Sequence, residues 1–133
     1  MSNRIYDRAL CLDKQVVFLF GNFVVGSTGA VGTVKGLGIS GVVRNSTGNY
    51  TITLSDTYSR YLYGDASLLH NTNFSGVSNV EIQQDPATFQ SSFQTNKTIT
   101  LQCYDNSGSA VDPAVASVLG FMVVARRSSV GIS

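Results

Sequence analysis

The chain has 133 residues, of which 43% are hydrophobic, 13% are charged and 13 residues are glycine. This length suits one domain, and a charged share about half the ordinary one argues against disorder, coiled coils and salt-bridged surface helices. Nine basic and eight acidic residues leave a formal net charge of +1, so the composition carries no electrostatic footprint for nucleic acid or anionic lipid. A net charge this close to zero favours association with other proteins.

The N-terminal segment is expected to form an arm. Residues 1–14 mix charged and apolar side chains, a pattern that fits a short helix or an extended segment. We expect no signal peptide, because the apolar run of residues 16–20 is short and ends at Gly21-Asn22. We also expect no membrane helix, since the longest apolar stretch, residues 115–125, falls well short of the ~20 residues that span a bilayer.

The next two segments predict β-structure. Residues 15–25 are dense in Val and Phe and predict two short strands or one bent strand, and residues 31–44 predict bent or bulged strands. Residues 36–41 also satisfy GxGxxG, the dinucleotide-binding pattern, which requires a helix directly after it. Because β-branched residues and a turn follow instead, we expect no cofactor and assign these glycines to strand bends.

The clearest turn precedes the clearest strand. Residues 45–49, Asn-Ser-Thr-Gly-Asn, tolerate the positive φ angles of a tight hairpin. In residues 50–55 large apolar side chains then alternate with Thr and Ser, which predicts a strand with one buried and one hydroxyl-bearing face. Residues 58–69 are rich in Tyr and Leu and favour a strand after Gly64-Asp65, with a helical turn near residues 59–63 as the alternative.

The second half of the chain continues this pattern. A polar loop over residues 70–76 precedes a half-exposed strand over residues 77–83, and residues 98–103 alternate almost as cleanly as residues 50–55. Between them, Phe89 and Phe93 stand four residues apart, which fits one helical turn or two anchors in an extended segment.

The last strand, residues 117–127, is apolar at both alternating sets of positions and is therefore expected to be buried on both faces. Another subunit could cover its second face, or the strand could lie inside a sandwich. Turn signals recur at intervals of roughly 8–15 residues without an amphipathic helix between them. We therefore predict an all-β fold, a single antiparallel β-sandwich or barrel, jelly-roll-like, in which residues 1–30 form the arm and first strands and residues 31–133 form the sandwich domain.

The chain offers few groups for catalysis or metal binding. It contains a single histidine, His70, which lies in a polar loop, and two distant cysteines, Cys11 and Cys103, outside any zinc-binding spacing. Carboxylates are scattered through the turns without the spacing of a calcium loop. We predict a non-enzymatic protein with no catalytic residues, no cofactor and no metal site.

Several stretches carry a resemblance to a known family. Residues 42–56 read Val-Val-Arg-Asn-Ser-Thr-Gly-Asn-Tyr-Thr-Ile-Thr-Leu-Ser-Asp, and Tyr58 follows. Residues 105–114 read Asp-Asn-Ser-Gly-Ser-Ala-Val-Asp-Pro-Ala and precede the apolar strand and the end Arg-Arg-Ser-Ser-Val. Together with the opening Tyr-Asp-Arg-Ala-Leu of residues 6–10, these stretches resemble small virion proteins of tailed bacteriophages. The likeness extends over most of the chain outside residues 69–95.

The resemblance implies an assembly protein without enzymatic activity. Within virions it favours a capsid decoration (cement) protein that is made in the host cytoplasm and sits on the capsid exterior. Its expected partners are the major capsid protein and further copies of itself, in a homotrimer, and neither nucleic acid nor a membrane. The alternative is a tail, head-fibre or spike component that binds a host receptor or glycan through the clustered Tyr58, Tyr61 and Tyr63. A small hydrolase or lectin-like module is a third reading.

Seven residues are candidates for protein contact, each with a core or solvated position as its alternative. Phe18, Phe20 and Phe23 are candidates for an apolar patch between subunits. Phe121 and Val123 represent the last strand in such an interface, and the basic pair Arg126 and Arg127 is suited to acidic groups of a neighbouring protein.

Overall fold

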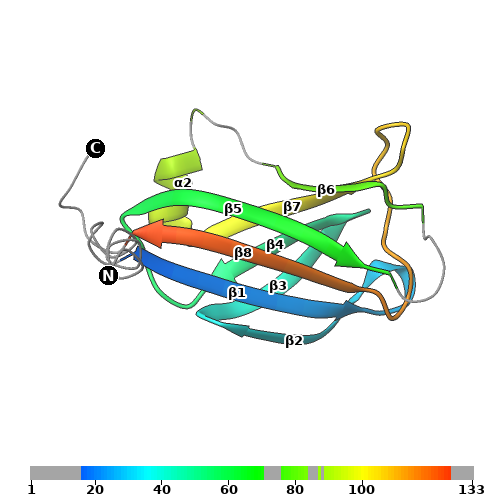
Figure 1. The fold of residues 1–133 in the computed structure, drawn as a ribbon, viewed down its shortest axis with the longest axis horizontal. Coiled ribbons are helices and arrows are strands. Elements are labelled where there is room, and N and C mark those ends of the chain that lie inside the picture. Colours follow the sequence, from blue (N-terminus) through cyan, green and yellow to red (C-terminus); the bar gives the residue numbers. More distant parts are fainter. Residues whose placement is uncertain (1–15, 71–75, 84–86, 88, 127–133) are drawn as a thin grey trace, which may run out of the picture.

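The computed structural model describes residues 16–70, 76–83, 87 and 89–126. Within these ranges, eight strands form two layers, and one α-helix packs beside them (Figure 1). The elements are β1 (Val16–Val25), the 3-10 turn η1 (Ser27–Gly29), β2 (Val31–Leu37), β3 (Ile39–Ser46), β4 (Asn49–Leu54), β5 (Arg60–Leu69), β6 (Asn79–Ile82), α2 (Phe89–Asn96), β7 (Thr98–Tyr104) and β8 (Val118–Arg126).

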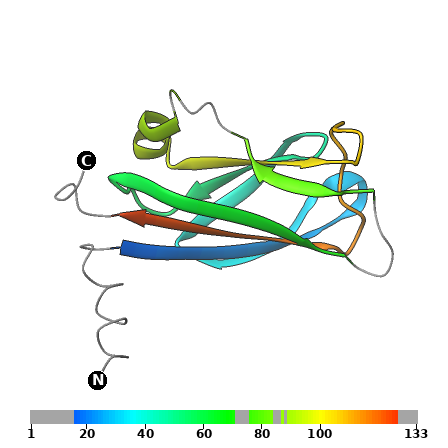
Figure 2. The same cartoon turned by 45° about the horizontal axis from the view of Figure 1, so that its top comes forward.

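The strands pair into two antiparallel sheets of four. Sheet A has the order β2-β1-β8-β5, and sheet B has the order β3-β4-β7-β6. The sheets lie face to face in an open sandwich and do not close into a barrel (Figure 2). The prediction of an all-β sandwich is therefore confirmed.

The core lies between the two sheets and is built from the alternating apolar positions. Tyr50, Ile52 and Leu54 of β4 are at most 1% exposed and face the inward residues of β1 and β8. The ring centroids of Phe23 and Tyr50 lie 4.9 Å apart, and the Tyr50 hydroxyl donates a hydrogen bond of 2.7 Å to the Gly29 carbonyl. A buried phenol retains a hydrogen-bond partner in this way.

β1, which lies in the segment predicted to hold the arm and first strands (residues 1–30), belongs to the sandwich. β1 pairs with β8 at nine successive positions and with β2 on its other side, so it is a central strand of sheet A. Val16–Val25 supplies core side chains such as Leu19 and Phe23. Residues 1–15 lie outside the described residues.

An aromatic cluster holds α2 against the sandwich. Tyr61 meets Phe89 edge to face at 4.6 Å and Phe93 at 5.7 Å, and Tyr58 lies 6.4 Å from Phe93. The spacing of Phe89 and Phe93 therefore marks a helical turn. The segment before residue 64 is strand rather than helix, because β5 starts at Arg60 and accommodates one extra residue at a bulge between Tyr61 and Tyr63.

Candidate interaction surface

The two sheets present outer faces of opposite character. On sheet B the outward positions of β4 and β7 are mostly threonines, Thr51, Thr53, Thr98 and Thr100, as the alternation predicts. On sheet A the outward positions alternate with core residues such as Leu19 and Val123, and many are apolar. Only sheet B therefore has a polar outer face of the kind that suits contact with water.

Strand register arranges most of the outer face of sheet A in four transverse rows, and a further row, Val16–Arg126–Arg60, lies at the end where β1 begins. Across adjacent strands, the four rows are Phe18–Val124–Tyr63, then Leu37–Phe20–Met122–Asp65, then Lys35–Asn22–Gly120–Ser67, and last Val24–Val118–Leu69. Two rows are wholly apolar apart from the Tyr63 hydroxyl. The two central rows carry the polar groups.

Large hydrophobic side chains gather on this face. Six of the nine that are exposed within the described residues belong to it, namely Phe18 (49%), Phe20 (49%), Val24 (38%), Leu37 (71%), Tyr63 (54%) and Leu69 (70%). The rings of Phe18 and Phe20 lie nearly parallel, with centroids 6.4 Å apart. Exposed apolar side chains gathered on one face mark protein interaction sites in soluble proteins. We call it the sheet A face.

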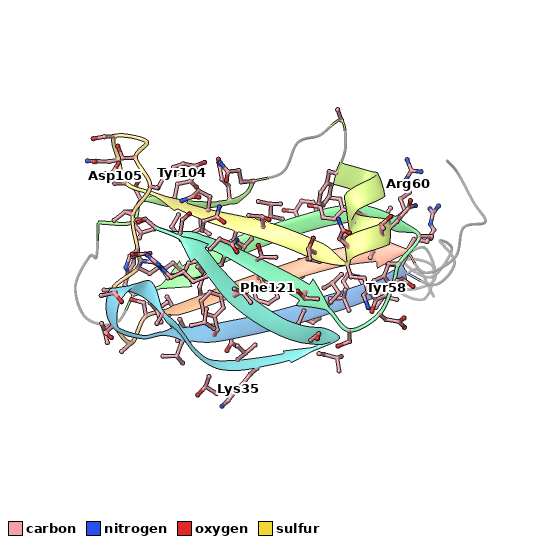
Figure 3. The ribbon with its side chains drawn as sticks, turned by 180° about the vertical axis from the view of Figure 1, so that it is seen from behind. Lys35, Tyr58, Arg60, Tyr104, Asp105 and Phe121 are labelled. Carbon is pink, nitrogen blue, oxygen red and sulfur yellow. The ribbon has the colours of Figure 1, made fainter. Side chains whose placement is uncertain are left out.

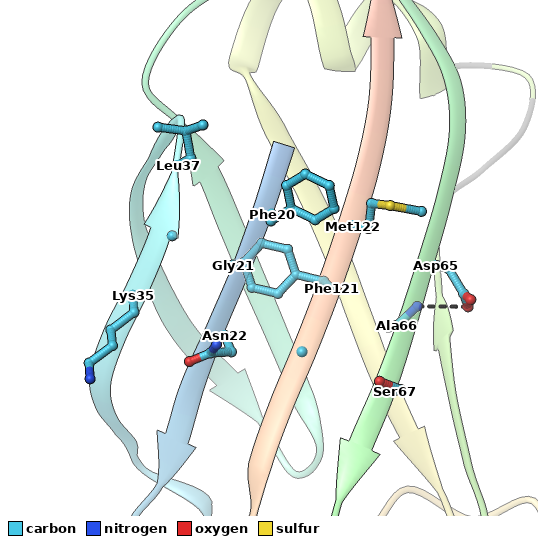
Figure 4. A pocket seen from close by; sticks show the side chains of 12 residues that line it. Phe20, Gly21, Asn22, Lys35, Leu37, Asp65, Ala66, Ser67, Phe121 and Met122 are labelled. Carbon is cyan, nitrogen blue, oxygen red and sulfur yellow. Dashed lines mark hydrogen bonds between the residues drawn. The ribbon is translucent and has the colours of Figure 1, made fainter. Parts of the chain in front are cut away.

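A hollow of about 430 Å³ crosses the centre of the sheet A face. It forms because Gly120 leaves an outward position of β8 without a side chain. Figure 4 shows Phe20 and Met122 on one side of it, and Lys35 and Asp65 toward opposite edges of the sheet. Figure 3 shows Lys35 projecting from the molecule.

The polar groups in the hollow have unused hydrogen-bonding capacity. Within the described part of the chain, the side chains of Asn22, Lys35 and Ser67 make no hydrogen bond or ion pair. Among the described residues, the Asp65 carboxylate accepts one hydrogen bond, from the adjacent Ala66 N–H at 2.8 Å. These groups are available to a partner.

A second polar cluster, at the end of the sandwich where the 26–30, 45–48 and 105–117 segments meet, is a structural clamp. The Asp112 carboxylate accepts bonds of 2.7 and 3.2 Å from the Arg44 guanidinium and one of 2.7 Å from the Gly48 N–H. Hydrogen bonding to Asp112 raises the pKa of Arg44. Because Asp112 already has three donors inside the chain, the cluster ties β3 and its turn to the loop before β8.

The structure divides the predicted contact residues between surface and core. Phe18 and Phe20 lie on the sheet A face. Phe23, Phe121 and Val123 are 0%, 6% and 1% exposed, so the prediction that they contact a partner is corrected. These three residues occupy the alternate set of strand positions, whose side chains point into the space between the two sheets.

The basic pair is not an exposed contact site within the described residues. Arg126 is 7% exposed, and its backbone carbonyl accepts bonds from Ser59. Arg127 lies outside the described residues. The tyrosine platform of the receptor-binding alternative is also dispersed, because Tyr58 is buried and Tyr61 packs on α2, leaving Tyr63 exposed.

Leu37, Leu69, Lys35 and Asp65 were not singled out from the sequence. Nothing in their own segments marks them, because they become neighbours of β1 and β8 only through strand pairing. One signal was present in β8, whose second apolar set includes Met122 and Val124. These side chains lie half-buried on the sheet A face.

The described residues contain neither a cluster of metal ligands nor a membrane-spanning helix. No three His, Cys, Asp or Glu side chains among them come together as a metal would require. None of the helices in the described ranges has the length and apolar character that crossing a bilayer requires. Cys103 is buried, and burial raises its pKa to about 12, which keeps the thiol protonated and unreactive.

The chain is thus a two-layer β-sandwich with one polar and one apolar outer face. Comparisons with protein-family models, curated proteins and solved structures found no match.

Proposed function

We propose that the chain is a bacteriophage virion structural protein, a capsid decoration (cement) protein that binds the outer major-capsid shell and stabilises it by bridging subunits. The sheet A face is the observation that carries this proposal. It presents six exposed large hydrophobic side chains on one layer of the sandwich. Such a surface promotes aggregation in a monomeric protein, whereas in a protein that assembles it forms an interface. The sequence resemblance to small virion proteins supports the same reading.

The proposed action is mechanical and requires no catalytic group. Each copy that spans two capsid subunits buries additional surface, and that buried surface must be separated before the shell can rupture. The partners are the major capsid protein and other copies of this chain, for which the resemblance implies a trimer. The proposed location is the capsid exterior, after synthesis in the host cytoplasm.

Rebinding to stripped capsids tests this proposal. Capsids of the encoding phage that lack the protein are mixed with the purified chain, pelleted and analysed for bound copies and for the temperature of rupture. We expect high-copy, saturable binding and a higher rupture temperature. Absence of binding by a folded, full-length chain would overturn the proposal.

Copy number and position in the virion separate decoration from the alternative. A tail, head-fibre or spike component would be present in few copies and would lie away from the main shell. A decoration protein would be distributed over the shell in a virion reconstruction. Density for the chain confined to a tail or a single vertex would favour the alternative.

A further inference from the structure

We propose that the sheet A face binds a second copy of this chain, face to face, about a two-fold axis parallel to the strands and between β1 and β8. The proposal rests on the same face as the proposed function, but it concerns self-association of the free protein, and it gives a dimer in place of the trimer that the resemblance implies. Its test is molecular mass in solution, whereas the proposed function is tested by capsid binding. Either can fail alone.

The two-fold axis determines which residues meet. Rotation about it places β1 of one copy over β8 of the other. Each outward residue of β1 therefore faces, in the partner, the β8 residue that is its own register neighbour. The facing pairs are Phe18 with Val124, Phe20 with Met122, Asn22 with Gly120, and Val24 with Val118.

These pairs are complementary in size. Asn22, exposed and without a hydrogen-bond partner among the described residues, lies opposite the hollow above the partner's Gly120. Phe20 lies opposite the partner's Met122, whose flexible thioether adapts well to an aromatic ring. Asn22 thus faces the open position at Gly120, and Phe20 faces an adaptable methionine.

The charges are also complementary under the same rotation. Lys35 and Asp65 are the two charged residues in the four rows, and they lie on the opposite edge strands β2 and β5. The rotation places β2 over the partner's β5, so Lys35 stands above the partner's Ser67 and one row, about 7 Å along the strand, from its Asp65. The long, flexible lysine side chain can reach over that interval. The symmetry forms this pair twice.

The positions of Lys35 and Asp65 distinguish between two possible arrangements of the dimer. A two-fold axis in the same plane but perpendicular to the strands would place β2 over the partner's β2 and β5 over its β5. Lys35 would then approach the second Lys35, and Asp65 the second Asp65, which is unfavourable. The axis parallel to the strands is therefore preferred.

The available area is sufficient for a stable dimer. Four strands spaced by about 4.8 Å and up to 10 residues long give roughly 600 Å² of flat surface on each copy. Both copies together bury roughly 1,200 Å² when each face is treated as flat, without the extra area of projecting side chains. This area exceeds the approximately 1,000 Å² expected of a specific interface. A sandwich-like spacing between the two faces would exclude water from the apolar rows.

Sedimentation velocity of the full chain over a micromolar concentration series tests the proposal, with charge reversal as the probe. We expect a dimer, and we expect Lys35→Asp or Asp65→Lys to raise its dissociation constant by at least about tenfold, since each places like charges together. The double variant Lys35→Asp/Asp65→Lys restores complementarity and should return within about threefold of the wild-type value. Glu81→Lys, an exposed reversal on sheet B, is the matched control and should leave the constant unchanged.

Circular dichroism establishes that each variant is folded, which is expected because both charged residues are exposed. The proposal is overturned if the wild-type chain is a monomer throughout the series or a trimer. It is also overturned if the single reversals have no effect, or if the double variant remains as weak as the single variants. Rescue by the double variant separates direct pairing from a general effect of charge.

Discussion

Cys103 and Tyr50 are ionisable residues enclosed in the apolar interior. Both are 0% exposed. Burial raises the pKa of Cys103 from 9.0 to about 12, and burial together with the charge of Asp112 raises the pKa of Tyr50 above its usual 10.0. Both groups are neutral at ordinary pH, so they contribute to stability as packed, uncharged side chains.

These shifts predict a loss of stability at alkaline pH. In the unfolded chain the Cys103 thiol loses its proton near pH 9, whereas in the folded chain it retains the proton until about pH 12. Since the unfolded state binds fewer protons in this window, the free energy of unfolding falls as pH rises, by up to about 1.4 kcal/mol per pH unit for each such group. Urea unfolding between pH 7 and pH 11 measures this: a plateau up to about pH 9 should precede the fall.

Cys103→Ala provides the control. It removes the titrating thiol, so it should be less stable at pH 7 because of the small cavity, yet lose less stability above pH 9. An identical alkaline slope in the wild-type protein and the variant would contradict the assignment.

At the scale of the strand, the contact between β1 and β8 depends on a glycine. A Cβ at Gly21 would lie 2.4 Å from Cζ of Phe121, which is closer than real Cβ contacts occur. The Phe121 ring therefore occupies the space in front of Gly21 and fills the core. The break that the sequence shows at Gly21-Asn22 is thus a packing site within one continuous strand.

We predict that Gly21→Ala destabilises the protein by about 1–3 kcal/mol, because the ring must move in a filled core. Thermal or urea unfolding measures the change. In a Phe121→Leu background the same substitution should cost less, since the opposing ring is gone. Gly41→Ala is the matched strand control: a Cβ there meets nothing within 4 Å, so the change should stay within about 0.5 kcal/mol. Equal effects at both glycines would refute the packing argument.

Strand periodicity also explains how much of the fold and of the sheet A face could be predicted from the sequence. The segments around Tyr50 and Ile99 were predictable because one set of positions is apolar and the other is hydroxyl-bearing, so a single register satisfies both faces. In β1 and β8 both sets are apolar, and the pattern does not determine which set is inward. The contact prediction therefore combined Phe18 and Phe20, which face outward, with Phe23, which faces the core. The hollow and the Lys35–Asp65 arrangement depend on pairing between distant strands and have no local signal.

For the whole molecule, the proposed dimer makes stability depend on concentration. Pairing adds buried apolar area to the folded state alone, so mass action should raise the unfolding temperature as protein concentration increases. Lys35→Asp, expected to be largely monomeric at low concentration, should show a weaker dependence while keeping a similar unfolding temperature in dilute solution, since Lys35 makes no ion pair within the described residues. Calorimetry at several concentrations measures both. A wild-type unfolding temperature independent of concentration would mean that the sheet A face does not hold two copies together, and the low charge of the chain would then have to be explained by a partner of another kind.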